Sequence, residues 1–165
     1  MNYASSLLWL GGYLASPAAL AATESQSPKE LVAEFLSEVR SGRAPERIGG
    51  YFADEVLAHQ MNSEAPETIR RTPADYAAHV REFRQQFGDY DLRVDELIAE
   101  GDRVYARYTQ IGVHAGTIEG HPATGHALRQ IASAVYRVQQ GRIVEYWIQV
   151  DRQGLSAQLE AEDPR

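Results

Sequence analysis

Residues 126–151 read HALRQIASAVYRVQQGRIVEYWIQVD, and this stretch carries the strongest signal for the fold. Two runs rich in β-branched and aromatic residues, 126–139 and 142–151, flank the pair Gln140-Gly141. A polar residue followed by glycine between two such runs favours a two-residue hairpin turn. We therefore predict that the two runs pair as antiparallel strands.

The register counted outward from this turn predicts which side chains share a face. With Gln139 opposite Arg142, one face carries a tryptophan opposite alanines, among polar neighbours. Its members are Gln130, Ala132, Ala134, Tyr136, Glu145, Trp147, Gln149 and Asp151. The other face is apolar, as a core or a sheet-to-sheet dimer contact would be. A large indole opposite small residues leaves room, which is typical of a lined pocket. An ordinary solvent-exposed face with one tryptophan is the alternative.

Two predicted helices precede the long strands. Ser27-Pro28 and Thr72-Pro73 each combine an N-cap residue with a proline at the first helical position. The second start opens an apolar stripe at helical spacing, formed by Tyr76, Val80, Phe83 and Phe87. Alternating runs at 90–99 and 103–114 then lead to the hairpin described above. Helices first and long strands afterwards predict an α+β fold, with the helices packed on one face of a curved antiparallel sheet.

The composition fits one globular domain and argues against several classes of protein. The chain has 165 residues, of which 44% are hydrophobic, and this is enough to bury a core. A formal net charge of −7 without a basic cluster argues against nucleic acid or an anionic membrane as a partner. The absence of cysteine excludes thiolate catalysis and cysteine-ligated metal sites.

The N-terminal segment differs from the rest of the chain. Residues 1–22 carry no charged side chain, and an apolar stretch is followed by Ser16-Pro17 and an Ala-x-Ala site at Ala19 and Ala21. This pattern predicts a signal peptide over 1–21, and hence a periplasmic or secreted protein. No basic residue precedes the apolar stretch, so the alternative is an apolar leader that stays attached to a cytoplasmic protein. The stretch is too short to span a bilayer. We assign residues 22–165 to a single domain.

An ordered set of motifs runs through this domain. The set consists of Glu100-Gly101-Asp102-Arg103-Val104, Gly112-x-His114-x-Gly116, Gly120-x-Pro122-Ala123-Thr124-Gly125, Gly141-Arg142-Ile143-Val144-Glu145-x-Trp147-x-x-x-Asp151 and Gln158-Leu159. Over about residues 28–160 it resembles the SnoaL-like polyketide cyclase (predicted ester cyclase) family of the nuclear transport factor 2-like superfamily. The resemblance implies a cone, in which a strongly curved antiparallel sheet wraps over N-terminal helices around an internal pocket. It also implies a homodimer.

The resemblance further implies a chemistry and a set of site residues. Similar enzymes close a ring by intramolecular aldol condensation without metal or cofactor, and a pocket aspartate takes and returns the proton. Asp151 matches that aspartate. His114 matches the family histidine, which could donate to the carbonyl or orient Asp151. The residues expected to contact a small hydrophobic substrate are Trp147, Tyr136, His59, Gln149 and Gln130.

Structural roles compete with these assignments. Asp151 immediately precedes a segment that favours a short helix, so it could be the N-cap of that helix. His114 could make a purely structural hydrogen bond. The histidines at 114, 121 and 126 lack a matching carboxylate spacing, so no metal is expected. The resemblance therefore implies a cofactor-free enzyme performing acid/base chemistry on a hydrophobic carbonyl compound. The alternative is an exported protein that binds a small hydrophobic ligand and catalyses nothing.

Overall fold

The computed structural model describes residues 26–161, so the predicted signal peptide over 1–21 lies outside the described residues. Six strands form one sheet in the order β2-β1-β6-β5-β4-β3. Their bounds are β1 (Phe52–Gln60), β2 (Glu67–Arg71), β3 (Asp91–Glu100), β4 (Arg103–Val113), β5 (Ala127–Gln139) and β6 (Arg142–Val150).

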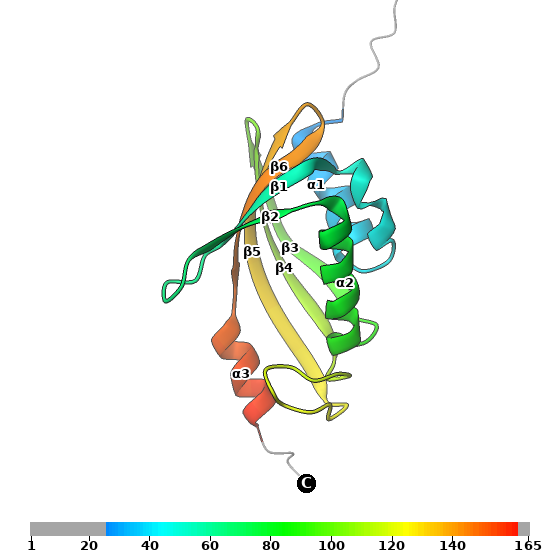
Figure 1. Cartoon of the computed structure of the whole chain (residues 1–165), viewed down its shortest axis with the longest axis vertical. Helices are drawn as coiled ribbons and strands as arrows, with labels where there is room; N and C mark the ends of the chain where they lie inside the picture. Colours follow the sequence, from blue (N-terminus) through cyan, green and yellow to red (C-terminus); the bar gives the residue numbers. More distant parts are fainter. Residues whose placement is uncertain (1–25, 162–165) are drawn as a thin grey trace, which may run out of the picture.

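The helices cover one face of this sheet at the positions that the sequence predicts. Figure 1 shows α1 (Pro28–Phe35) and α2 (Pro73–Phe87) together on one side of the curved strands. Both helices begin with a capping box, in which Ser27 or Thr72 and the acidic residue three positions later satisfy each other's backbone N–H groups. The predicted helix starts are therefore confirmed. A third helix, α3 (Arg152–Glu160), follows β6 and packs against β5.

The segment after α1 winds differently. A π-helical turn, η1 (Leu36–Arg40), continues α1, and a 3-10 helix, η2 (Pro45–Gly50), leads into β1. In the sheet, β1 pairs parallel to β6, whereas the other neighbours are antiparallel. Neither the short β2 nor the parallel pair is predicted from the sequence, but the α+β class with one curved, unclosed sheet is confirmed.

The register of the last hairpin corrects one expectation. The turn at Gln140-Gly141 is confirmed, because Gln139 pairs with Arg142. The register then shifts, since Arg137 pairs with Glu145 and leaves Val144 as an extra residue on β6. This β-bulge moves every later side chain of β6 to the opposite face. The predicted shared face of Tyr136 and Trp147 is therefore wrong.

The bulge serves the packing of the core. Both Ile143, before the bulge, and Tyr146, after it, are buried beneath the helices. On the concave side, the ring of Phe35 lies 5.5 Å from the rings of Phe52 and Tyr136 and 5.6 Å from that of Tyr76. Trp147 instead lies on the convex side, where it pairs with Val135. The aromatic core thus decides which face each half of β6 presents.

Within residues 26–161, no helix combines the length and apolar character that a membrane crossing would require.

Candidate functional site

A cavity of about 290 Å³ lies between α2 and the concave face of the sheet. Aromatic and aliphatic side chains form much of its wall, and a few polar groups project among them. The helix contributes Tyr76, His79 and Phe83, and the strands contribute Gln130, Tyr136, Tyr146, Ile148 and Val150. Apolar walls with a few placed polar groups are typical of small-molecule sites.

Three buried tyrosine hydroxyls supply hydrogen-bond donors in this cavity. Burial raises the pKa of Tyr76 and Tyr136 well above the ordinary value, and raises the pKa of Tyr146 to about 12. All three side chains are therefore protonated and neutral at physiological pH. They can donate hydrogen bonds to an oxygen of a bound molecule.

Two arginines and a neutral histidine also belong to the polar part of the wall. Arg40 is only 4% exposed, and it lines the cavity together with Arg71. Burial, reinforced by the charges of Arg40 and Arg71, lowers the pKa of His79 from 6.5 to about 3. Arg40 Nη1 lies 3.5 Å from His79 Nε2, so the neutral imidazole accepts from the guanidinium. None of these three residues is predicted as a site residue from the sequence, although Arg40 occupies a core-facing helical position four residues after Leu36.

The depressed pKa of His79 predicts a pH-dependent stability. The unfolded chain binds a proton at His79 below about pH 6.5, whereas the folded protein does so only near pH 3. The stabilisation is therefore complete above about pH 6.5 and is lost as the pH falls towards 3. Between about pH 8 and pH 4, the free energy of unfolding of the wild type should fall by about 2 kcal/mol more than that of His79→Gln, which keeps an acceptor near the Nε2 position. Urea unfolding of both proteins at the two pH values measures this difference. The difference in unfolding free energy between the two proteins at pH 8 is the internal control. An equal pH dependence of the unfolding free energy in both proteins would contradict the prediction.

Asp151 lies in a second hollow that adjoins the cavity. Glu119 and Val150 line both hollows, and the second contains the exposed carboxylate of Asp151. Asp151 also caps α3, because its Oδ1 accepts a hydrogen bond of 2.8 Å from the Gly154 N–H. Gly154 leaves room for this carboxylate, since a Cβ there would lie 2.2 Å from Asp151 Oδ2. The capping contact foreseen as the alternative is thus present, in a hollow next to the cavity.

His114 is buried just after the end of β4, and it lines neither the cavity nor the hollow of Asp151. Its side chain is only 1% exposed, and its Nδ1 lies 3.2 Å from Thr124 Oγ1. Among residues 26–161, its Nε2 has no hydrogen-bond partner. The ring hydrogen bond is therefore to Thr124, rather than to Asp151 as one of the predicted roles required.

The glycines on either side of His114 explain why this motif needs them. A Cβ at Gly112 would lie 2.2 Å from the carbonyl oxygen of Phe87, and one at Gly116 would lie 2.6 Å from that of Gln85. The missing side chains let the end of β4 approach the C-terminus of α2. There, the N–H groups of Ala115 and Gly116 donate to the Gln86 carbonyl at 2.9 and 3.2 Å. This satisfies a carbonyl that a helix end leaves without an intrahelical partner.

The five residues predicted to contact substrate do not share one pocket. Tyr136 and Gln130 line the cavity. Trp147 and Gln149 line a separate hollow of about 220 Å³ on the convex face, because the bulge reverses their direction. His59 also belongs to the convex face, where its ring stacks on that of Trp147 at 5.0 Å.

The convex face holds a hydrogen-bonded cluster around His59. His59 Nε2 lies 2.8 Å from Glu145 Oε1, and Arg137 donates to Glu145 Oε2 at 2.7 and 2.8 Å. The Arg103 guanidinium covers the Trp147 ring at 4.9 Å. These contacts partner the charged groups with one another, so the cluster has the character of a structural network.

In the described part of the chain, no three histidine, aspartate or glutamate side chains come together as a metal site would need.

The fold and the cavity define a class of protein, namely α+β cones with an internal cavity. The chain belongs to the SnoaL-like polyketide cyclase family, whose model matches residues 30–159. The nuclear transport factor 2-like fold implied by the sequence resemblance is confirmed by solved structures. Among curated proteins, no sequence matches the chain.

Several solved structures are similar over nearly their whole length. A candidate polyketide cyclase from Acidithiobacillus ferrooxidans is 27% identical, with a TM-score of 0.71 over 84% of this chain and 96% of the other. IdmH, a candidate polyketide cyclase from Streptomyces antibioticus, is 25% identical, with a TM-score of 0.69 over 82% of this chain and 99% of its own. AclR from Streptomyces galilaeus, described as a candidate hydroxylase, is 23% identical, with a TM-score of 0.66 over 80% of this chain and 94% of its own. Together with the family, the first two support a cyclase-like function on a small molecule, whereas the third shows the fold alone.

Proposed function

We propose that the protein is a cofactor-free enzyme that performs aldol-cyclase-like acid/base chemistry on a hydrophobic carbonyl compound. The observation that carries the proposal is the position of Asp151 in a hollow that shares Glu119 and Val150 with the tyrosine-lined cavity. A carboxylate beside an apolar cavity can act on a carbon acid held there. Membership of the cyclase family supports the same reaction class.

The proposed reaction needs only groups of this chain and one substrate. The Asp151 carboxylate takes a proton from the carbon beside a carbonyl, and the C–H electron pair forms an enolate. Buried donors such as the Tyr146 hydroxyl stabilise the enolate oxygen. The enolate carbon then attacks a second carbonyl of the same molecule, which forms the new C–C bond. The protonated Asp151 returns its proton to the resulting alkoxide, so protons and electrons balance.

The first half of this reaction can be tested without knowing the substrate. We expect the protein to accelerate the exchange of the α-protons of 2-tetralone, a bicyclic ketone, in deuterium oxide, as followed by NMR. Val150→Phe adds an aromatic ring where the two hollows meet, and it should reduce the acceleration by about tenfold or more. Ile98→Phe, on the convex face of β3, is the matched control and should exchange like the wild type. An acceleration that survives Val150→Phe would place the reaction elsewhere.

One observation favours a second candidate function, a binding protein without catalysis. The Asp151 carboxylate is exposed and already engaged in capping α3. A binder would retain hydrophobic ligands in the cavity and would show no acceleration of exchange. It would also retain them when Asp151 is changed to asparagine. Ligand retention and proton exchange, measured on the same variants, separate the two functions.

Export and a homodimer are further proposals. The unusual N-terminal 21 residues support export. Apolar side chains on the convex face support a dimer between sheets, because Ile98, Ile111 and Ile131 are exposed there. Native mass spectrometry of the protein from its own host reports the processed mass, the subunit number and any retained ligand together. A full-length monomer would contradict both proposals.

A further inference from the structure

Arg40 is a buried cation without a carboxylate partner. Its side chain is only 4% exposed, and no ion pair among residues 26–161 includes it. Its Nη2 donates to Gln110 Oε1 at 3.2 Å, whereas its Nε has no hydrogen-bond partner within the described residues. The guanidinium lies over the rings of Phe83 and Tyr108, at 5.2 and 5.8 Å. A buried charge that lacks an opposite charge is costly to the fold, so packing alone is a poor reason for it.

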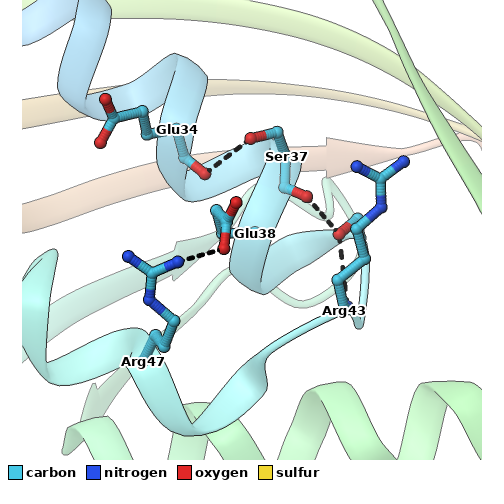
Figure 2. A network of polar contacts seen from close by, with 6 residues as sticks. Glu34, Ser37, Glu38, Arg43 and Arg47 are labelled. Atoms are coloured by element: carbon cyan, nitrogen blue, oxygen red, sulfur yellow. Dashed lines mark hydrogen bonds and ion pairs between the residues drawn. The ribbon is translucent and has the colours of Figure 1, made fainter.

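The backbone around Arg40 is held firmly in place. Arg40 ends the π-helical turn η1, and such turns are frequent at functional sites. The Tyr90 hydroxyl donates to the Arg40 carbonyl at 2.6 Å, and the Ser41 hydroxyl donates to the Ser37 carbonyl at 2.6 Å. Figure 2 shows the polar contacts around this turn, where the Ser41 hydroxyl also accepts from the Arg43 N–H, the Ser37 hydroxyl donates to the Glu34 carbonyl, and Arg47 pairs with Glu38. Hydrogen bonds on both sides of the turn thus fix its backbone, with the Arg40 guanidinium in the wall of the cavity.

The charged groups around the cavity are mainly positive. Arg71 lines the same cavity, and its buried Nε also has no partner among residues 26–161. Tyr108 and Gln110 contact Arg40 without lining the cavity, and their Oη and Nε2 atoms are also buried without a hydrogen-bond partner among residues 26–161. The one acidic side chain that the described residues contribute to the cavity is Glu119, which is exposed and accepts from the Ser156 hydroxyl at 3.4 Å. The interior thus offers two cations and several donors, although the chain as a whole carries a net charge of −7.

We infer that the ligand of this cavity is an anion, an aromatic or similarly apolar carboxylic acid whose ionised carboxylate binds Arg40, with Arg71 as the second cation. A planar carboxylate matches the hydrogen-bonding fork of a guanidinium, and the pair is strong where water is excluded. The apolar walls hold the remainder of the molecule. With its carboxylate at Arg40, the far end of the ligand extends towards Glu119 and Val150, beside the hollow of Asp151. The inference rests on the proposed function only in treating this cavity as the ligand site.

Two probes of one shape test the charge preference directly. 2-Naphthoate and 2-naphthamide differ in charge but hardly in size, and isothermal titration calorimetry measures their affinities. We expect the wild type to bind naphthoate about tenfold tighter or more, and Arg40→Met to lose most of this preference although Arg71 remains in the cavity wall. Arg103→Met removes a cation from the Trp147 ring on the convex face and should keep the preference. Equal affinities in the wild type, absent naphthoate binding, or an undiminished preference in Arg40→Met would each overturn the inference.

A second readout does not depend on a variant that must fold. The charge of Arg40 is one of the causes that lower the pKa of His79, so a bound carboxylate should raise that pKa. NMR titration of the His79 ring, with naphthoate and with naphthamide, measures the change. A rise of the His79 pKa with naphthoate alone, to above about pH 4 where the carboxylate is ionised, supports the inference. The neutral ketone 2-tetralone reports separately on the proposed catalysis. If the wild type prefers naphthoate but does not accelerate 2-tetralone exchange, the proposed enzymatic function is contradicted. If it accelerates exchange but shows no preference for naphthoate, only the anion site is contradicted.

Discussion

Asp151→Asn is expected to slow the protein-catalysed exchange of 2-tetralone α-protons by about 100-fold or more, while the protein stays folded. The amide of asparagine cannot take a proton from carbon, so the proposed acid/base group is removed. Asparagine is nevertheless as good an N-cap as aspartate, because its side-chain oxygen can accept from the Gly154 N–H. The substitution therefore separates catalysis by the carboxylate from its capping of α3.

The controls for Asp151→Asn follow from this separation. Urea unfolding should give a midpoint close to that of the wild type. Asp102→Asn, at the exposed turn between β3 and β4, removes a carboxylate far from the cavity and should leave exchange unchanged. An exchange rate in Asp151→Asn equal to that of the wild type would remove Asp151 from the mechanism. The binder would be favoured instead by a wild type that retains naphthoate and does not accelerate exchange at all.

Gly112→Ala is expected to lower the free energy of unfolding by about 3 kcal/mol. The added Cβ would lie 2.2 Å from the Phe87 carbonyl oxygen and 3.0 Å from Tyr90 Cβ. The first contact is backbone at the end of a helix, so no rotation of a side chain relieves it. Strand β4 or the C-terminal turn of α2 must move, and this loosens the packing beside the cavity. Urea denaturation at constant pH measures the loss.

Gly49→Ala is the matched control for this prediction. A Cβ at Gly49 would meet nothing within 4 Å, so the same chemical change should alter stability by less than about 0.5 kcal/mol. The comparison therefore isolates the contact with α2 from the general effect of adding a methyl group. Equal urea midpoints for Gly112→Ala and the wild type would contradict the role assigned to the Gly-x-His-x-Gly motif.

Several elements of the fold follow from signals within a few residues. The capping boxes at Ser27 and Thr72 need only a hydroxyl, a proline and an acidic residue at fixed spacing. The turn at Gln140-Gly141 needs only two residues that accept a positive φ, with observed values of 49° and 69°. Local chemistry determines such features, and the structure confirms them.

The candidate site was predicted less completely. Asp151, Tyr136 and Gln130 lie in or beside the cavity, whereas Trp147 and Gln149 face the other way. The difference arises at Val144, where one extra residue reverses the faces of β6. The local sequence does not distinguish a regular hairpin from a bulged one here, because neighbouring residues of β6 are both apolar and fit either register.

From its own local patterns, the sequence establishes the helix starts, the strands, the turn of the last hairpin and, through its motifs, the family. Two features with functional weight depend on residues far apart in the chain. The bulge at Val144 buries Tyr146 beside Phe52 and Tyr136, and η1 brings Arg40 to His79 and Gln110. Capping and turn energies act between neighbours and can be read along the chain. The face that a strand buries and the partner that a buried charge receives are settled only when distant segments pack together.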